Sequence, residues 1–200
     1  MKDTPVGQKE TTVVERPWPP EQGEWTYEDW LKLPDDGYRY EVIDGVLYMS
    51  PPPLIRYQRS SIRIVDIFLA FLKLHPLGEL LYAPVGVRLP NQPVPLQPDI
   101  VFVRAEGVDI IQEHYIEETP DLVIEILSPS NWLYDRREER RVYQESGVPE
   151  DWIADPRAQT VEIYVLEQGV YQLAGQYGRG EVAVPRLLTG FEVPVEAIFA

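Results

Sequence analysis

A carboxylate in the middle of an apolar strand is the feature that most constrains this chain. Residues 120–131, PDLVIEILSPSN, open on Pro120 and Asp121 and continue as a strand-like run with Glu125 near its centre. An unpaired carboxylate loses several kcal/mol or more of hydration free energy when it is buried. Glu125 therefore faces water from an edge strand, pairs with a basic side chain, or binds a metal ion.

Composition limits the class of protein. A length of 200 residues with 44% hydrophobic content suits one large domain with a substantial core. The absence of cysteine excludes a disulfide framework and thiolate metal ligands, and it fits a reducing cytoplasm. The longest apolar run, VDIFLAFLKL, is short and carries Asp66 and Lys73, so we expect a cytoplasmic protein without membrane association. The formal net charge of −15 argues against broad attraction to nucleic acid.

Turn residues and apolar periodicity divide the chain into elements. Residues 1–24 are polar and proline-rich and are predicted to be a flexible N-terminal tail, whereas residues 25–200 are predicted to form a single domain. We expect a short helix from Thr26 through Leu31, a hairpin over 38–50 turning at Asp44-Gly45, a helix over 55–74, strands at about 80–89, 99–103, 122–127 and 151–155, a helix over 131–146 ended by Gly147, a hairpin turning near Gly169 and a closing segment over 185–199. This order predicts an α/β (α+β) domain with a mixed β-sheet flanked by helices.

Two of the predicted strands begin alike, with QPDIVFV at 97–103 and TPDLVIEIL at 119–127. If they are neighbours about 4.8 Å apart, Asp99 and Glu125 bring carboxylate oxygens to a common point. Mg²⁺ prefers such oxygen ligands and leaves positions for water and a phosphate oxygen. Glu41 in RYEVIDG offers a third, weaker acid. The structural alternative gives Asp99 a turn role and Glu125 a water-facing or arginine-paired role.

Five ordered motifs resemble the Uma2 family of restriction endonucleases, within the PD-(D/E)XK nuclease superfamily. They are RYEVIDGVLYMSPPP, QPDIVFV, PDLVIEILSPSN, DRREERRVYQESGVPEDWIADP and RLLTGFEVPVEAIF, and the resemblance covers residues from about 25 to 200. It implies a restriction-endonuclease-like core and a DNA endonuclease activity that depends on Mg²⁺ or Mn²⁺. It also implies that Asp99 and Glu125 bind the metal and that Glu41 is an additional catalytic acid.

The chain departs from the family pattern at two positions. Members usually carry a lysine on the helix after LSPS, where this chain has Glu139, and often a histidine where it has Tyr57. A cation beside the metal orients the attacking water and offsets charge on the phosphate, which glutamate cannot do. Arg140 or Arg136 is then expected to supply this positive charge. The alternative function is a catalytically weakened nuclease-fold scaffold that binds nucleic acid or a protein partner.

The remaining charged residues give weaker signals. Arg56, Arg59 and Arg63 share one helix face by their spacing, and they either contact a phosphate backbone or form a solvated surface. His75 and His114 have no companion motif, so a zinc site or a Ser-His-Asp triad lacks support. A homodimer would suit an enzyme that meets two antiparallel DNA strands.

Overall fold

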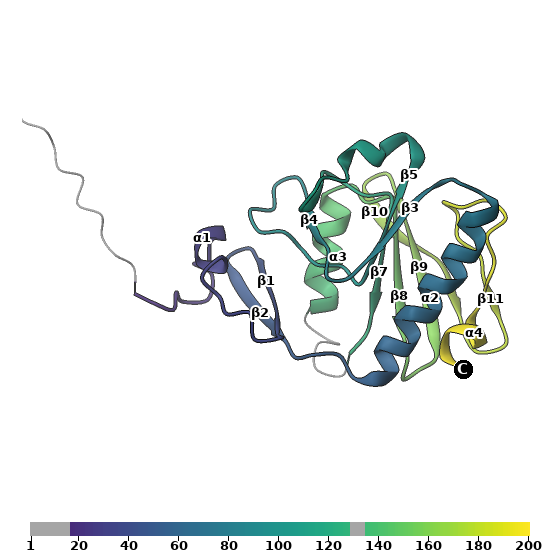
Figure 1. Cartoon of the computed structure of the whole chain (residues 1–200), viewed down its shortest axis with the longest axis horizontal. Helices are drawn as coiled ribbons and strands as arrows, with labels where there is room; N and C mark the ends of the chain where they lie inside the picture. Colours follow the sequence, from purple (N-terminus) through teal and green to yellow (C-terminus); the bar gives the residue numbers. More distant parts are fainter. Residues whose placement is uncertain (1–16, 129–134) are drawn as a thin grey trace, which may run out of the picture.

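The computed structural model describes residues 17–128 and 135–200 and centres on a six-stranded sheet (Figure 1). The strand order is β10-β9-β8-β7-β5-β3. The strands are β3 (Gly78–Tyr82), β5 (Ile100–Arg104), β7 (Leu122–Ile126), β8 (Glu150–Asp155), β9 (Thr160–Glu167) and β10 (Val170–Tyr177). Strands β7 and β8 pair in parallel and the other neighbours pair antiparallel, which confirms the predicted mixed sheet.

Helices cover both faces of this sheet. Figure 1 shows α2 (Ile55–Leu74) and α4 (Val195–Phe199) on one side and α3 (Asp135–Glu145) on the other. Alternate residues of β7 follow this division, because Ile124 packs in the core under α2 whereas Val123 packs in the core under α3. The predicted helix over 55–74 is confirmed, and residues 131–134 of the second predicted helix lie outside the described residues.

A separate hairpin joins the domain beside α3. Strands β1 (Arg39–Ile43) and β2 (Val46–Ser50) form a two-stranded sheet of their own, and α1 (Tyr27–Trp30) precedes them. The turn residues Asp44 and Gly45 have φ values of 50° and 75°, as a two-residue hairpin turn requires. Trp25, Val42 and Val94 are buried in a small hydrophobic cluster of their own.

Part of the segment that was predicted to be a tail packs against this hairpin. The amide of Gly23 donates to the Gly45 carbonyl at 2.8 Å. The side chain of Gln22 accepts from the Leu47 amide at 2.7 Å and donates to the Leu47 carbonyl at 3.1 Å. Residues 1–16 of the predicted tail lie outside the described residues.

The prediction of one continuous strand over 80–89 is wrong, because two separate strands cover this range. Strand β3 ends at Tyr82, and a second strand, β4 (Gly86–Arg88), pairs in parallel with β6 (Tyr115–Glu117). Pro84 lies between them and has no N–H group to continue the hydrogen-bond ladder. The 3₁₀ helix η1 (Ala105–Ile110) and the two-residue strands β11 (Val182–Ala183) and β12 (Val193–Pro194) were also not predicted.

Candidate active site

Adjacent strands bring the two predicted metal-binding acids together. Strands β5 and β7 pair antiparallel with Ile100 opposite Ile124, so the next step of this register places Asp99 opposite Glu125. Both side chains lie on the face of the sheet that α3 covers, because side chains alternate along each strand. The Ile126 amide donates to Asp99 Oδ2 at 2.8 Å, which fixes this carboxylate at the end of the ladder. The predicted adjacency of the two strands is thereby confirmed.

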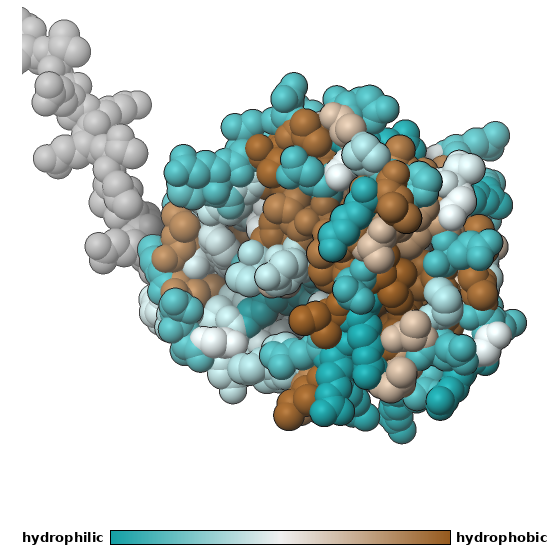
Figure 2. Space-filling view, turned by 45° about the vertical axis from the view of Figure 1, so that its right-hand side comes forward, coloured by the Kyte–Doolittle hydropathy of each residue, from teal (hydrophilic) through white to brown (hydrophobic). Residues whose placement is uncertain are grey.

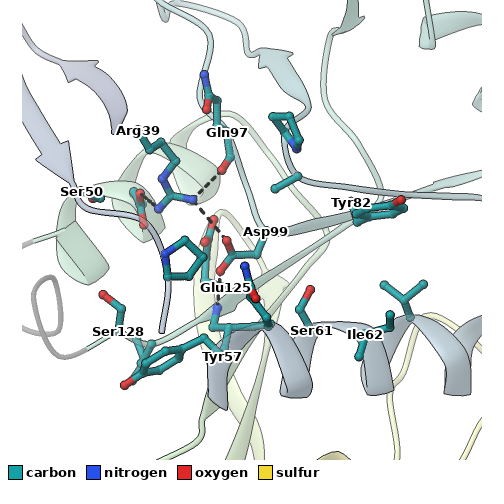
Figure 3. Close-up of a pocket in the computed structure, with 18 of the residues that line it drawn as sticks. Arg39, Ser50, Tyr57, Ser61, Ile62, Tyr82, Gln97, Asp99, Glu125 and Ser128 are labelled. Carbon is teal, nitrogen blue, oxygen red and sulfur yellow. Dashed lines mark hydrogen bonds and ion pairs between the residues drawn. The ribbon is translucent and has the colours of Figure 1, made fainter. Parts of the chain in front are cut away.

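Arg39 of the hairpin reaches into the same cluster of acids (Figure 3). Its Nε atom lies 3.3 Å from Glu41 Oε2, its Nη1 atom 3.3 Å from Asp99 Oδ1 and its Nη2 atom 3.8 Å from Glu139 Oε1. Nη1 also donates to the Gln97 carbonyl at 2.9 Å, and the Gln97 amide donates to Glu41 Oε1 at 2.9 Å. One guanidinium and one backbone segment therefore hold Glu41, Asp99 and Glu139 around a common centre.

The surroundings of Glu125 answer the question that its sequence position raises. Strand β7 lies inside the sheet, so the explanation of a water-facing edge strand is excluded. The side chain is buried and accepts a hydrogen bond from the Tyr143 hydroxyl at 2.7 Å. Burial and the charge of Asp99 raise the pKa of Glu125 well above its usual range, and the nearby charge of Arg39 opposes them only in part. The surroundings of Glu125 thus disfavour its charged form, because its protein neighbours do not offset the cost of burying that charge.

Glu139 on α3 belongs to the same buried cluster. Burial and the charges of Glu125 and Glu41 raise its pKa well above the usual range, and a hydrogen bond shared with the Glu41 carboxyl adds to this effect. Burial also raises the pKa of Asp99, although Arg39 and the Ile126 amide oppose it. The Arg39 guanidinium thus lies near four carboxyl groups, those of Glu41, Asp99, Glu125 and Glu139.

Arg140, predicted to supply the catalytic positive charge, is engaged beside this cluster. Its Nε atom lies 3.5 Å from Oδ2 of the buried Asp151, and its guanidinium stacks on the Tyr164 ring at 3.8 Å from the ring centroid. The side chain of Arg136 lies outside the described residues. Sequence reasoning missed Arg39, although its two-residue spacing from Glu41 on a strand is a signal that both point to the same side.

An open cavity of about 900 Å³ extends from these acids along α2. Its lining includes Asp99 and Glu125 at one end, and Ile62 and Tyr82 lie on its other side (Figure 3). Tyr57 also lines it. The lining excludes the clustered arginines Arg56, Arg59 and Arg63. Arg63 instead donates to the Ile198 carbonyl at 3.3 Å.

The donor chemistry of the cluster fits a hard divalent cation. Asp99 and Glu125 lie opposite each other on one face of two neighbouring strands, and the acids around them outnumber the one guanidinium. Within residues 17–128 and 135–200, however, no three His, Asp or Glu side chains are gathered as a ready metal site. Arg39 supplies the positive charge among these acids in the described structure.

No helix in the described part of the chain is both long and apolar enough to cross a membrane.

Comparison with solved structures shows the fold. A crystal structure described as a putative nuclease belonging to DUF820 from Anabaena variabilis matches with a TM-score of 0.70 at 21% sequence identity, over 87% of this chain and 97% of that chain. The match confirms the restriction-endonuclease-like α/β fold.

Comparison by sequence shows the family. No curated protein matches the chain. The sequence profile of Uma2, described as "Putative restriction endonuclease", matches residues 27–196, which is most of the chain. The protein therefore belongs to the Uma2 family, and this membership supports a nuclease function.

Proposed function

We propose that this protein is an endonuclease that hydrolyses phosphodiester bonds in DNA with the help of Mg²⁺ or Mn²⁺. The observation that carries the proposal is the pair Asp99 and Glu125, which lie opposite each other on adjacent strands within a cluster of acidic side chains around Arg39. The open cavity beside them gives a substrate access to this point. A bound divalent ion would polarise the scissile phosphate and lower the pKa of the attacking water.

The surrounding residues hold the two acids in place. The Ile126 amide orients Asp99, and the Tyr143 hydroxyl orients Glu125. Glu41 is tied to the Gln97 amide and to Arg39, so in this proposal it positions the guanidinium and adds negative charge beside the metal ligands. Preorganised groups of this kind lower a barrier because they need no rearrangement during the reaction.

Arg39 is the residue that we assign to phosphate binding in place of the missing lysine. The described residues that line the cavity include two cations, Arg39 and Arg140. Arg140 is held by Asp151 and Tyr164, whereas Arg39 lies between Asp99 and Glu139. Its planar fork of N–H donors suits a phosphate oxygen, and it stays protonated, so it offsets charge without serving as a base.

Plasmid cleavage tests this proposal. The full-length protein is incubated with plasmid and Mg²⁺ or Mn²⁺, beside Asp99→Asn, Glu125→Gln and the control Glu79→Gln, which changes an exposed acid on β3. We expect cleavage by the wild type and the control, and loss of cleavage in the two site variants. Equal cleavage by all four proteins, or cleavage that persists in EDTA, would contradict the proposal.

A second candidate function is that of a catalytically weakened scaffold that binds nucleic acid or a protein partner. Glu139 favours it, because this acid lies 3.8 Å from Arg39 where the family carries a cation. The net charge of −15 also disfavours broad DNA binding. The variant Glu139→Lys separates the two candidates. If the wild type is inactive and this variant cleaves DNA, the native protein is a scaffold.

A further inference from the structure

The cavity beside the acid cluster has an apolar wall that the proposed phosphate chemistry does not use. Ile62 and Leu69 of α2 and Tyr82 at the end of β3 line it, and they are 68%, 42% and 64% exposed. Tyr38, which precedes β1, also lines the cavity and is exposed. Single exposed hydrophobic residues are ordinary, but exposed apolar side chains gathered around one cleft mark a surface that a ligand or partner covers. Figure 2 shows hydrophobic residues gathered in a band across this side of the molecule, with hydrophilic residues on both sides.

We infer that this wall holds an unpaired base of a single-stranded DNA substrate, while a phosphate of that strand lies at Asp99 and Glu125. The inference rests on the proposed function, because that function assigns the phosphate and the metal ion to these two acids. The acids and the wall line the same cavity, and Figure 3 shows Tyr82 and Ile62 to the right of Asp99. A nucleotide has the same division, because its charged phosphate and its flat base are attached to different positions of the sugar. Every base has a π-face that stacks on an aromatic ring, whatever the sequence.

The size and the polar groups of the cavity suit a nucleotide. Its volume of about 900 Å³ lies within the range of about 300–1,000 Å³ for clefts that enclose small organic ligands. Gln58 and Ser61 of α2 also line it, so an amide and a hydroxyl group are available to the polar edge of a base. A base in a duplex lies inside the stack and must first be extruded, which costs free energy. An unpaired base reaches the wall without that cost.

The charges of the cavity also favour a single strand over a duplex. Duplex binding draws its strength from Lys and Arg side chains that contact phosphates along the helix. The described lining residues include two cations, Arg39 and Arg140, and each of them already lies beside a buried acid of its own chain. Asp66 adds a negative charge to the lining. Base stacking on apolar and aromatic side chains does not need a basic surface, so it suits this cavity better than duplex binding does.

Binding of matched probes to the full-length protein tests the inference, at a fixed salt concentration and with Ca²⁺ in place of Mg²⁺ to limit cleavage. The probes are an oligothymidylate of about 20 nucleotides, its duplex with oligodeoxyadenylate, and an abasic deoxyribose phosphate chain of the same length. We expect the oligothymidylate to bind at least about fivefold more tightly than the other two, because neither of them offers an unpaired base to the wall. Tyr82→Ala should remove this preference without a change in circular dichroism, and Tyr82→Phe should keep it. The control Leu173→Ala changes an exposed side chain on β10 outside the cavity lining and should bind like the wild type.

Equal binding of the oligothymidylate and the abasic chain would overturn the inference, because phosphates alone would then explain the contact. So would duplex binding as tight as single-strand binding, an unchanged preference in Tyr82→Ala, or no binding of the oligothymidylate.

Cleavage rates in Mg²⁺ distinguish a failure of this inference from a failure of the proposed function. We expect plasmid to be cleaved more slowly than single-stranded DNA, because the plasmid must unpair locally before a base reaches the wall. If both are cleaved at the same rate, the nuclease proposal stands and the inference fails. If the oligothymidylate binds through Tyr82 but no DNA is cleaved, the nuclease proposal fails and the wall remains a site for an unpaired base.

Discussion

Replacing Glu125 by glutamine separates a metal site from a structural ion pair. Glutamine keeps nearly the same shape and an oxygen that accepts from the Tyr143 hydroxyl, so packing and this hydrogen bond survive. It removes one negative charge from a cluster in which Glu41, Asp99 and Glu139 already surround Arg39. Without a metal, the variant should therefore unfold with a larger free energy than the wild type, by about 1–3 kcal/mol at pH 8.

The stability advantage of Glu125→Gln over the wild type should increase as the pH rises. The folded-state pKa of Glu125 is raised above its ordinary value of 4.5, so the folded protein holds this proton more tightly than the unfolded chain does. The wild type therefore loses stability as the pH rises from the unfolded-state pKa of Glu125 through its folded-state pKa. The introduced glutamine side chain does not titrate, so the variant does not show this loss. The difference between the two proteins should vanish near pH 4 and reach its full size above the raised pKa.

Divalent ions should reverse the order of the two proteins. At a Mg²⁺ concentration of 1,000 times Kd, binding adds about 4.1 kcal/mol to the wild type, and the variant should gain little of this. For a 200-residue domain, each kcal/mol shifts Tm by roughly 2–4 °C. Thermal melts in EDTA and in Mg²⁺ from pH 4 to pH 8 measure both effects, with Glu79→Gln as the control. A metal-free variant less stable than the wild type at pH 8 would refute the reasoning and make Glu125 a structural partner of Arg39.

Three further variants test other parts of the structure. Arg39→Met should lower the cleavage rate by about 100-fold, whereas the Mg²⁺-dependent rise in Tm should persist. Arg39→Lys should recover part of the rate. Unchanged cleavage by Arg39→Met would exclude Arg39 from phosphate binding. Arg140→Ala should cost about 2–4 kcal/mol in urea unfolding, because it removes the cation beside buried Asp151, and a neutral result would show that the pair adds no stability. Gly45→Ala should cost roughly 1–3 kcal/mol, because φ is 75° and a Cβ would meet the Gly23 carbonyl; an unchanged urea midpoint would show that the turn relaxes.

Local patterns predicted the elements that local physics determines. The three- and four-residue spacing of apolar residues predicted α2, and Asp44-Gly45 predicted the hairpin turn, because both signals act within a few residues. The shared Pro-Asp openings of two apolar runs indicated that Asp99 and Glu125 are neighbours, which the antiparallel register confirms. The sequence also drew attention to Glu139, and the structure places it 3.8 Å from Arg39.

The parts that sequence reasoning missed depend on contacts between distant segments. Arg39 meets Asp99 across 60 residues, and this meeting follows from how the hairpin packs on the sheet. The pairing of β4 with β6 joins two three-residue strands, which are too short to give a periodic signal. The contact of Arg140 with Asp151 likewise joins two elements, because Asp151 belongs to β8 and Arg140 to α3.

The hairpin supplies two members of the cluster, Arg39 and Glu41, from outside the main sheet. Arg39 and Glu41 belong to a two-stranded unit with its own small hydrophobic cluster, whereas Asp99 and Glu125 belong to the six-stranded sheet. Local detachment of that unit would withdraw the guanidinium and one carboxyl group in a single event, together with Ile43, which packs in the core under α3. We therefore expect the acid cluster to come apart at a lower temperature than the six-stranded sheet, because the cluster needs both units in place.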